Sequence, residues 1–321
     1  MALSSPRHFP LASLAQSLEV RMLGLALVIF VGLSLASPHF LTTNNLLNVL
    51  DQSVVVGIVA IGMTFVILTG GIDLSVGSVA GLTGVILGLA LQDFSIPVAI
   101  AMAVLAGAAI GAVSGVLIGY FGLAAFVVTL GMMAIGRSLA YIFSGQTSIS
   151  NIPFALQDLV FTSVLGVPTN VVCLLVLYVL AGLYLSYTKG GRTIYAIGSN
   201  KEAARAAGLP VLFYAILPYV ISGAFAAIAV TFLTAQILSV DPLTGNLLEL
   251  DAIAAVVIGG ASLYGGRGSI AGTLIGVLIM VMIRNGLNLL GVSPFWQGTA
   301  IGSIIILALL VERLLSRRSE R

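Results

Sequence analysis

The sequence predicts an all-α membrane protein, a polytopic bundle of about ten transmembrane helices. Three observations support this: 59% of the 321 residues are hydrophobic, only 7% are charged, and the mean hydropathy is +1.17. A soluble domain carries roughly a quarter charged residues. The 37 glycines suit helices that approach one another closely in lipid. The formal net charge of +2 is too small to indicate a nucleic-acid surface, so membrane lipid is expected as a partner and nucleic acid is not.

Ten apolar runs have the length of about 20 residues that a helix needs to cross a bilayer. They are 21–38, 48–69, 76–92, 95–118, 121–144, 169–187, 211–236, 248–264, 269–290 and 295–312. The runs 76–92 and 248–264 are the weakest, because glycine-rich turns shorten each at one end. We therefore expect a transmembrane domain over 21–312, a cytoplasmic N-terminal segment over 1–20 and a basic cytoplasmic tail over 313–321.

The basic residues predict the orientation. With ten crossings and a cytoplasmic N-terminus, eleven of the thirteen lie in the cytoplasm or at inner helix ends, as the positive-inside rule requires. They are Arg7, Arg21, Lys189, Arg192, Lys201, Arg205, Arg267, Arg313, Arg317, Arg318 and Arg321. Ser34-Leu35-Ala36 loosely imitates a signal-peptide cleavage site, but cleavage would leave nine spans and invert the charge rule. We expect a bacterial plasma (inner) membrane protein with both termini in the cytoplasm.

A polar, glycine-rich turn separates the second expected span from the third. Gly70 and Gly71 allow a tight reversal of the chain. Asp73 or Ser75 can then accept hydrogen bonds from the free N–H groups of the next helix. Two interpretations stay open: residues 70–78 form either a capped cytoplasmic turn or a broken helix lining a translocation path, where irregular backbone at membrane depth is tolerated.

The longest cytoplasmic segment, 188–210, contains a predicted short helix. Asn200 can cap the start of this helix, and Gly208 can end it. The helix is either a solvated connector or an element that docks into a groove of another protein, with Glu202 and Arg205 orienting it.

The two remaining basic residues, Arg137 and Arg284, lie in the outer halves of expected spans. A charge near a helix centre costs about 2.5–3.5 kcal/mol, less if the side chain reaches the headgroups. Such snorkelling is one interpretation. The other is that both line a hydrated path, helped by Asn285 and Asn288, of which Asn288 shares a helix face with Arg284.

Only acidic charges are expected on the outer face. They are Asp93, Asp158 and Asp241, with Glu249 and Asp251 at the start of one span and Asp51 near the end of another. Such a face either meets a basic patch on a soluble partner or is what the positive-inside rule leaves behind. Glu249 and Asp251 are also candidates for the path or its gate.

Several kinds of site are missing from the sequence. It has no G-x-x-x-x-G-K-[ST] motif for ATP hydrolysis, and its single cysteine, Cys173, excludes an intrachain disulfide. His8 and His39 lie far from any carboxylate pair, so we expect no metal and no cofactor. No row of membrane-centred carboxylates marks an ion route. The chain is therefore expected to be a transporter subunit, not an enzyme, with its energy supplied from elsewhere.

Five motifs occur in an order that is typical of one family. They are IGMT at 61–64, GGIDLSVGS at 70–78, ELDAIAAVVIGG at 249–260, GGRGS at 265–269 and NGLNLLGV at 285–292. Over about residues 37–311 the chain resembles the ribose-type permeases of ABC sugar importers. A departure is Leu247-Leu248, where family members often place an aromatic residue that belongs to the outer gate, so the substrate preference can differ from ribose.

The resemblance implies a permease that pairs with itself or a related permease, two ABC ATPase subunits and an extracytoplasmic sugar-binding protein. Residues 199–208 are similar to the loop that inserts a coupling helix into the ATPase. The residues so identified are Asn200, Glu202, Ala203, Ala204, Arg205 and Gly208. The later Ile-x-Leu-Pro element of that loop is out of register here, at 216–218.

The implied mechanism is alternating access, in which closure of the ATPases is transmitted through the coupling helix and a pentose or hexose passes between two permease halves. Candidates for the path or gate are Asp73, Ser75, Arg137, Glu249, Asp251, Arg284, Asn285 and Asn288. Three alternatives remain: a gradient-driven secondary carrier, a passive channel, and an ABC importer for a branched-chain amino acid or an autoinducer.

Overall fold

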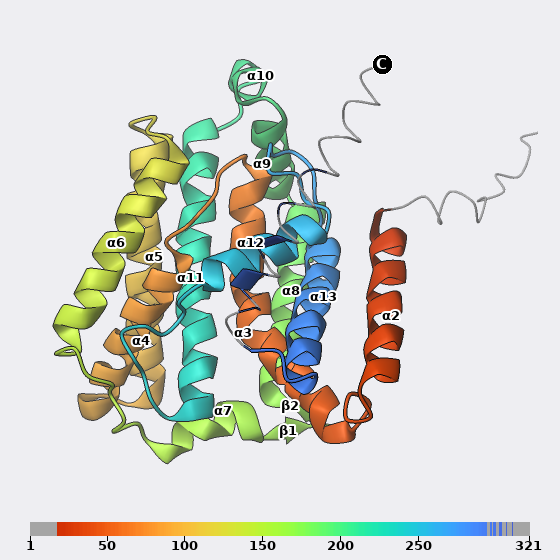
Figure 1. Cartoon of the computed structure of the whole chain (residues 1–321). Helices are drawn as coiled ribbons and strands as arrows, with labels where there is room; N and C mark the ends of the chain where they lie inside the picture. The colour runs from red at the N-terminus through yellow and green to blue at the C-terminus, as the bar shows by residue number, and fades with distance from the viewer. Residues whose placement is uncertain are drawn as a thin grey trace, which may run out of the picture.

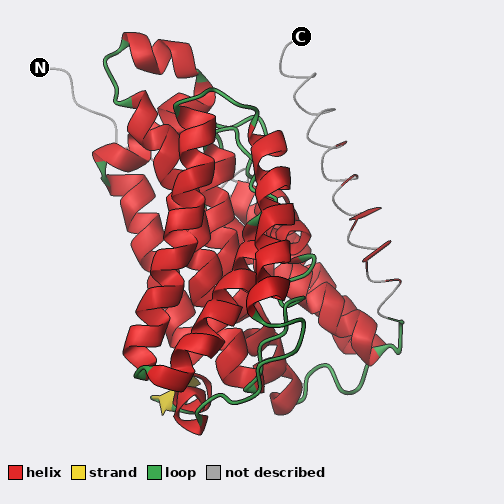
Figure 2. Cartoon of the chain, turned by 90° about the vertical axis from the view of Figure 1, so that its left-hand side faces the viewer, coloured by secondary structure: helices red, strands yellow, loops and turns green. Residues whose placement is uncertain are grey.

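The structure, a computed structural model, describes residues 18–293 and isolated positions between 296 and 310. Over these residues it contains eight helices long and apolar enough to cross a membrane, and its strands are confined to one short hairpin (Figures 1 and 2). The expected all-α polytopic membrane fold is therefore confirmed. The long helices are α2 (Leu18–Ala36), α3 (Thr43–Leu68), α4 (Val76–Asp93), α5 (Ile96–Gly119), α6 (Ala125–Phe143), α8 (Thr169–Tyr187), α11 (Val211–Ile237) and α13 (Ile270–Leu289). The short elements are η1 (Phe154–Gln157), α7 (Asp158–Phe161), β1 (Ser163–Val164), β2 (Val167–Pro168), α9 (Lys189–Ser199), α10 (Lys201–Ala206) and α12 (Leu248–Ile258).

One of the ten expected spans differs from the prediction. The run 248–264 is helical only over the 11 residues of α12, which at 1.5 Å per residue reach about 16 Å, half of a bilayer core. The run 295–312 lies mostly outside the described residues, as do most of the N-terminal segment 1–20 and the tail 313–321. The weak run 76–92 is the full-length helix α4.

Helix α11 forms the centre of the bundle and packs against α3, α4 and α5. Its closest neighbour is α5, whose Gly107, Gly111 and Gly115 lie directly against the α11 backbone. A side chain at any of these glycines would overlap α11 carbonyl oxygens. Small residues therefore allow the close approach that stabilises helix pairs in lipid, where there is little hydrophobic drive between helices.

Two non-helical segments enter the bundle from opposite ends (Figure 1). The first, 69–75, leaves the end of α3 and runs inward until Asp73 bonds Ser222, the twelfth of the 27 residues of α11. Asp73 and Ser75 are each only 2% exposed. Of the two interpretations of this segment, these contacts favour the second, because the irregular backbone lies inside the bundle.

The second non-helical segment, 238–247, returns from the end of α11 to the start of α12 along one face of α4. Gly77, Gly81 and Gly84 form that face, and side chains there would overlap Gly245, Thr244 and Val240 respectively. The glycines therefore make room for non-helical chain inside the bundle. Gly245 of the second segment and Glu249 of α12 contact the first turn of α4 at Gly77, two residues after the first segment ends.

Candidate functional site

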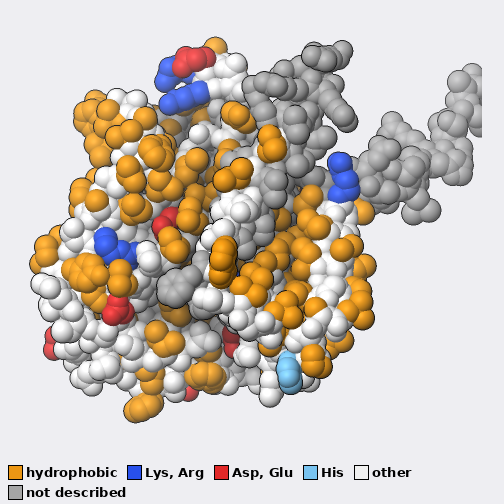
Figure 3. Space-filling model, in the orientation of Figure 1, with side chains coloured by type: hydrophobic (Ala, Val, Ile, Leu, Met, Phe, Trp, Pro, Cys, Tyr) orange, Lys and Arg blue, Asp and Glu red, His pale blue; other side chains and the backbone are white. Residues whose placement is uncertain are grey.

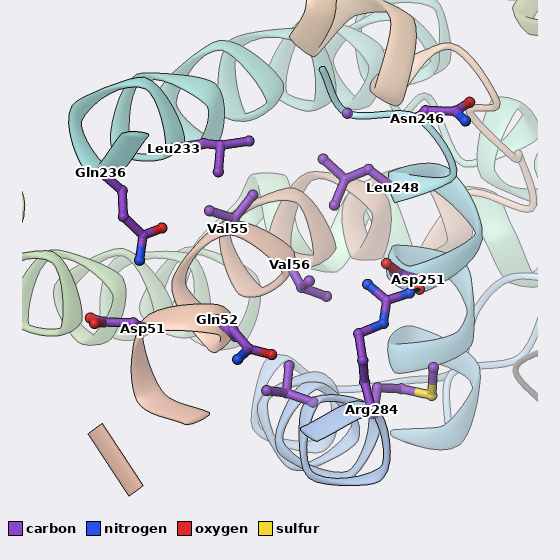
Figure 4. Close-up of a pocket in the computed structure, with 13 residues that line it drawn as sticks. Asp51, Gln52, Val55, Val56, Leu233, Gln236, Asn246, Leu248, Asp251 and Arg284 are labelled. Carbon is purple, nitrogen blue, oxygen red and sulfur yellow. Dashed lines mark hydrogen bonds and ion pairs between the residues drawn. The ribbon is translucent and has the colours of Figure 1, made fainter. Parts of the chain in front are cut away.

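A pocket of about 270 Å³ lies among α3, α11, α12 and α13 (Figure 4). The lining residues of α11 and α13 belong to the second half of each helix, and those of α3 lie in or next to its first half. Figure 1 shows these helix halves on the side of the β1–β2 hairpin, opposite α10. The lining of the pocket combines six polar or charged side chains with apolar walls. The residues are Asp51, Gln52, Val55, Val56, Leu233, Gln236, Gly245, Asn246, Leu248, Asp251, Met280, Val281 and Arg284. A polar cavity of this kind is a default site for a small solute.

An ion pair closes one wall of the pocket. Arg284 Nη2 on α13 donates to Asp251 Oδ1 on α12 over 2.7 Å. The Arg284 side chain is 36% exposed, whereas that of Asp251 is 8% exposed. The guanidinium is therefore the more accessible partner of the pair. Arg284 faces the cavity and does not extend toward the lipid headgroups. Both residues were expected at the path, and the structure brings them together.

The opposite wall carries two carboxamides that the sequence did not single out. Gln52 on α3 and Gln236 on α11 line the pocket, and their side chains make no hydrogen bond within the described part of the chain. Asp51 lies beside Gln52, and its Oδ1 accepts from Asn170 Nδ2 over 2.8 Å. A glutamine in a membrane helix was the available signal, but only the fold shows that the two amides share one cavity.

Asn285, one of the candidates for the path or gate, is not among the residues that line the pocket. It forms a buried amide pair with Asn45 of α3, with one hydrogen bond in each direction at 2.8 and 3.0 Å. Asn288 is not among the pocket residues either. The pair instead fixes α13 against the start of α3, because each amide satisfies the other where water is absent.

Arg137 also has a different place from the one expected. Its Nη1 donates to the carbonyl oxygens of Pro242 and of Thr244, the latter over 3.1 Å. These carbonyls belong to the irregular segment 238–247, which has no helical partners for them. A charged donor such as Arg137 can satisfy two carbonyl oxygens that have no other partner. Arg137 therefore holds that segment against α4 and α6. It neither snorkels nor lines the pocket.

The acidic residues at the start of α12 are not part of an exposed outer face. Counted over the whole residue, Glu249 is 9% exposed and Asp251 is 6% exposed. The expectation that they lie at the outer surface is therefore wrong. The Glu249 carboxylate lies against Gly77, in the first turn of α4. Negative charge is favourable there, because the free N–H groups of a helix start carry partial positive charge.

Asp73 and Ser75 stabilise the other irregular segment. Asp73 Oδ1 accepts from the backbone N–H and the hydroxyl of Ser75, at 3.0 and 2.6 Å, and Asp73 Oδ2 accepts from Ser222 Oγ over 2.7 Å. Ser75 occupies the N-cap position of α4 but makes no capping bond with its side chain. The pair therefore ties the segment to α11 and does not cap α4 in the way expected.

At the far end of the bundle, α10 has the expected form. Asn200 Oδ1 accepts from Ala203 N over 2.9 Å and caps the helix start. The helix ends at Gly208, whose φ of +75° suits glycine. Glu202 and Arg205 project from it as an exposed pair 3.1 Å apart, above a bundle whose sides are largely hydrophobic (Figure 3). The contact of buried Ala204 with α9 and α11 anchors the helix.

Comparison with known proteins identifies the family. Residues 45–311 match the model described as the branched-chain amino acid transport system / permease component. The chain belongs to this permease family. No solved structure matches it.

Curated relatives of this permease cover nearly its whole length. The ribose import permease protein RbsC of Escherichia coli (strain K12) is 42% identical over 96% of this chain and 97% of its own. The D-allose transport system permease protein AlsC of the same strain is 37% identical over 91% and 90%. The L-arabinose ABC transporter permease protein AraH of Azospirillum brasilense is 38% identical over 92% and 87%.

Proposed function

We propose that this permease is the membrane-spanning subunit of an ABC importer that carries a monosaccharide, a pentose or hexose, into the cell. The observation that supports this most strongly is that permeases named for three different sugars each match at least 91% of the chain. The pocket adds support, because its amides and guanidinium can replace hydrogen bonds that a sugar gives up on leaving water.

Energy comes, in this proposal, from separate ABC ATPase subunits, since the chain has no P-loop motif of its own. The subunits bind α10, where Glu202 and Arg205 are 77% and 60% exposed. A movement of α10 is transmitted to α11 in two ways, by the connecting chain and by the packing of Ala204 against Val211. Helix α11 in turn packs against α3, which precedes the segment 69–75, and against α4, which lies along the segment 238–247. This contact path supports the proposed coupling role of α10.

The opposite end of the bundle receives the extracytoplasmic sugar-binding protein. Asp93, Asp158 and Asp241 are exposed on this side and suit a basic partner surface. A second permease, identical or related, completes the path, and the two halves alternate in access. The complex lies in a bacterial inner membrane with α10 and both termini in the cytoplasm, since the basic residues Lys189 and Arg267 lie at the α10 end.

The test is co-purification of the tagged full chain from its native membranes in mild detergent, followed by an assay of vanadate-sensitive ATP hydrolysis. We expect a P-loop subunit and that activity to accompany the permease. Uptake of D-ribose, D-allose, L-arabinose and L-leucine is then measured in cells with and without the gene. Uptake of leucine alone would favour the amino-acid importer that the family description names. Protonophore-sensitive uptake by the chain alone would instead indicate a gradient-driven carrier, and leak without energy a channel.

A further inference from the structure

We propose that the pocket among α3, α11, α12 and α13 is a transient binding site for one neutral monosaccharide, held by Gln52, Gln236 and Arg284. This inference rests on the proposed function and adds to it a site of contact inside the permease itself. The sugar would stop there after release from the binding protein and before it crosses to the α10 side.

The two glutamines provide the first reason. Each carboxamide offers two N–H donors and a carbonyl acceptor, and neither has a partner in the described part of the chain. They approach the cavity from different helices, with Gln236 pointing from α11 toward the Asp51 end of α3 (Figure 4). A sugar hydroxyl donates one hydrogen bond and accepts others, so the amides complement a polyol from two sides.

The ion pair provides the second reason. Arg284 carries five N–H donors, and the structure commits one nitrogen to Asp251. The remaining donors belong to a guanidinium that is 36% exposed and lines the cavity. Because Asp251 fixes this group in place, it can offer charge-assisted hydrogen bonds to a hydroxyl or ring oxygen without first being ordered.

The charge of the pocket limits the class of solute. The charges of Arg284 and Asp251 cancel. The remaining charged side chain of the lining is Asp51, which gives the pocket one net negative charge. The carboxylate of Asp51 repels a second negative charge in the pocket. A sugar acid, a sugar phosphate or the carboxylate of an amino acid is therefore disfavoured, whereas an uncharged sugar is not.

Size and shape complete the assignment. A pocket of about 270 Å³ has room for a solute the size of one monosaccharide. Val55, Leu233 and Leu248 form apolar walls against which the C–H faces of a sugar ring can pack.

The test measures D-ribose, D-allose and L-arabinose uptake in cells that carry the chain with its native partners. The variants are Gln52→Leu, Gln236→Leu and both together. For the sugar transported by the wild type, we expect the maximal rate per permease to fall about fivefold for each single variant and more than tenfold for the double. The half-saturating concentration should stay unchanged, because capture from the medium belongs to the binding protein. Gln92→Leu, at an exposed site on α4, is the matched control and should transport normally.

A second measurement does not depend on transport. In purified full-length chain with Cys173→Ser, Gln236→Cys is modified by a methanethiosulfonate reagent, and high millimolar D-ribose should slow this modification while D-ribonate should not. Gln92→Cys should be unaffected by either. Wild-type uptake by the double leucine variant, or equal protection by the two solutes, would overturn the site. A wild-type chain that imports none of the three sugars would overturn the proposed function instead, so the two failures are distinguishable.

Discussion

At the scale of single residues, the glycines of α4 decide whether non-helical chain can remain inside the bundle. Gly77 faces Gly245 and the Glu249 carboxylate so closely that a methyl group would overlap both. By contrast, Gly131 on α6 has nothing within 4 Å of the place a methyl group would occupy. The two helical glycines therefore form a matched pair for separating packing from helix propensity.

We expect Gly77→Ala to destabilise the permease by about 1–3 kcal/mol, because the overlap forces α4 away from the start of α12. Gly131→Ala should be neutral or stabilising by up to about 1 kcal/mol, since alanine is the better helix former. The measurement is the melting temperature of each purified variant by size-exclusion chromatography after heating. Equal melting temperatures for the two variants would contradict the close packing of α4 on the segment 238–247.

The identity of the polar residues in the spans could be predicted from the sequence, but their partners could not. Arg137, Arg284 and Asn285 all stand out as costly in lipid, which is a local property. Only Arg284 lines the pocket, because Arg137 bonds carbonyls more than 100 positions away and Asn285 bonds Asn45. Which acceptor each side chain meets depends on how distant helices are placed, and a single sequence does not encode that directly.

At the scale of elements, α10 is the part of the permease most open to a direct test. Its cap and its end are set by neighbouring residues, and its outward face carries the exposed pair Glu202 and Arg205. An exposed pair at this spacing contributes at most about 1 kcal/mol to stability. Changes there should therefore affect a partner subunit more than the fold.

We expect the double variant Glu202→Ala/Arg205→Ala to uncouple ATP hydrolysis from sugar uptake while the amount of permease in the membrane stays normal. Gly208→Pro should do the same more completely, because proline cannot adopt the φ of +75° that ends the helix. The measurement is the ratio of sugar imported to ATP hydrolysed in membranes containing all subunits. As a control, Glu202→Arg/Arg205→Glu preserves the pair within α10 but exchanges its charges. A wild-type ratio in all three would contradict the coupling role.

Elements also differ in how far the sequence predicts them. Helix α10 is predicted correctly, because Asn200 and Gly208 act on their own neighbours. Helix α12 is not, because the run 248–264 is apolar enough for a span, yet its helix ends at Ile258. Its start is set by the segment 238–247, which depends on the glycine face of α4 and on Arg137. The hydropathy of a segment indicates whether it can be exposed to lipid. It does not indicate how deep in the bundle its helix begins.

At the scale of the whole molecule, the orientation in the membrane links these features to function. The α10 end carries the basic residues of α9, α10 and the loop before α13, whereas Asp93, Asp158 and Asp241 are exposed toward the β1–β2 end. Under the proposed function, import requires the pocket to open toward the binding protein and α10 to face the ATPase subunits. The residues that line the pocket belong to helix halves that Figure 1 shows next to β1–β2, so a single orientation satisfies both requirements.

We expect Leu165→Cys, in a chain with Cys173→Ser, to react with a membrane-impermeant maleimide added to cells with an intact inner membrane. Leu165 is fully exposed at the tip of the β1–β2 hairpin. Lys201→Cys, exposed at the start of α10, should react only after the membrane is disrupted. The reverse pattern would place α10 outside the cell, away from ATP, and would contradict the coupling role of α10 and the direction of transport together. The expected pattern places the pocket on the side from which a delivered sugar arrives, since positive charge at the α10 end holds that end in the cytoplasm.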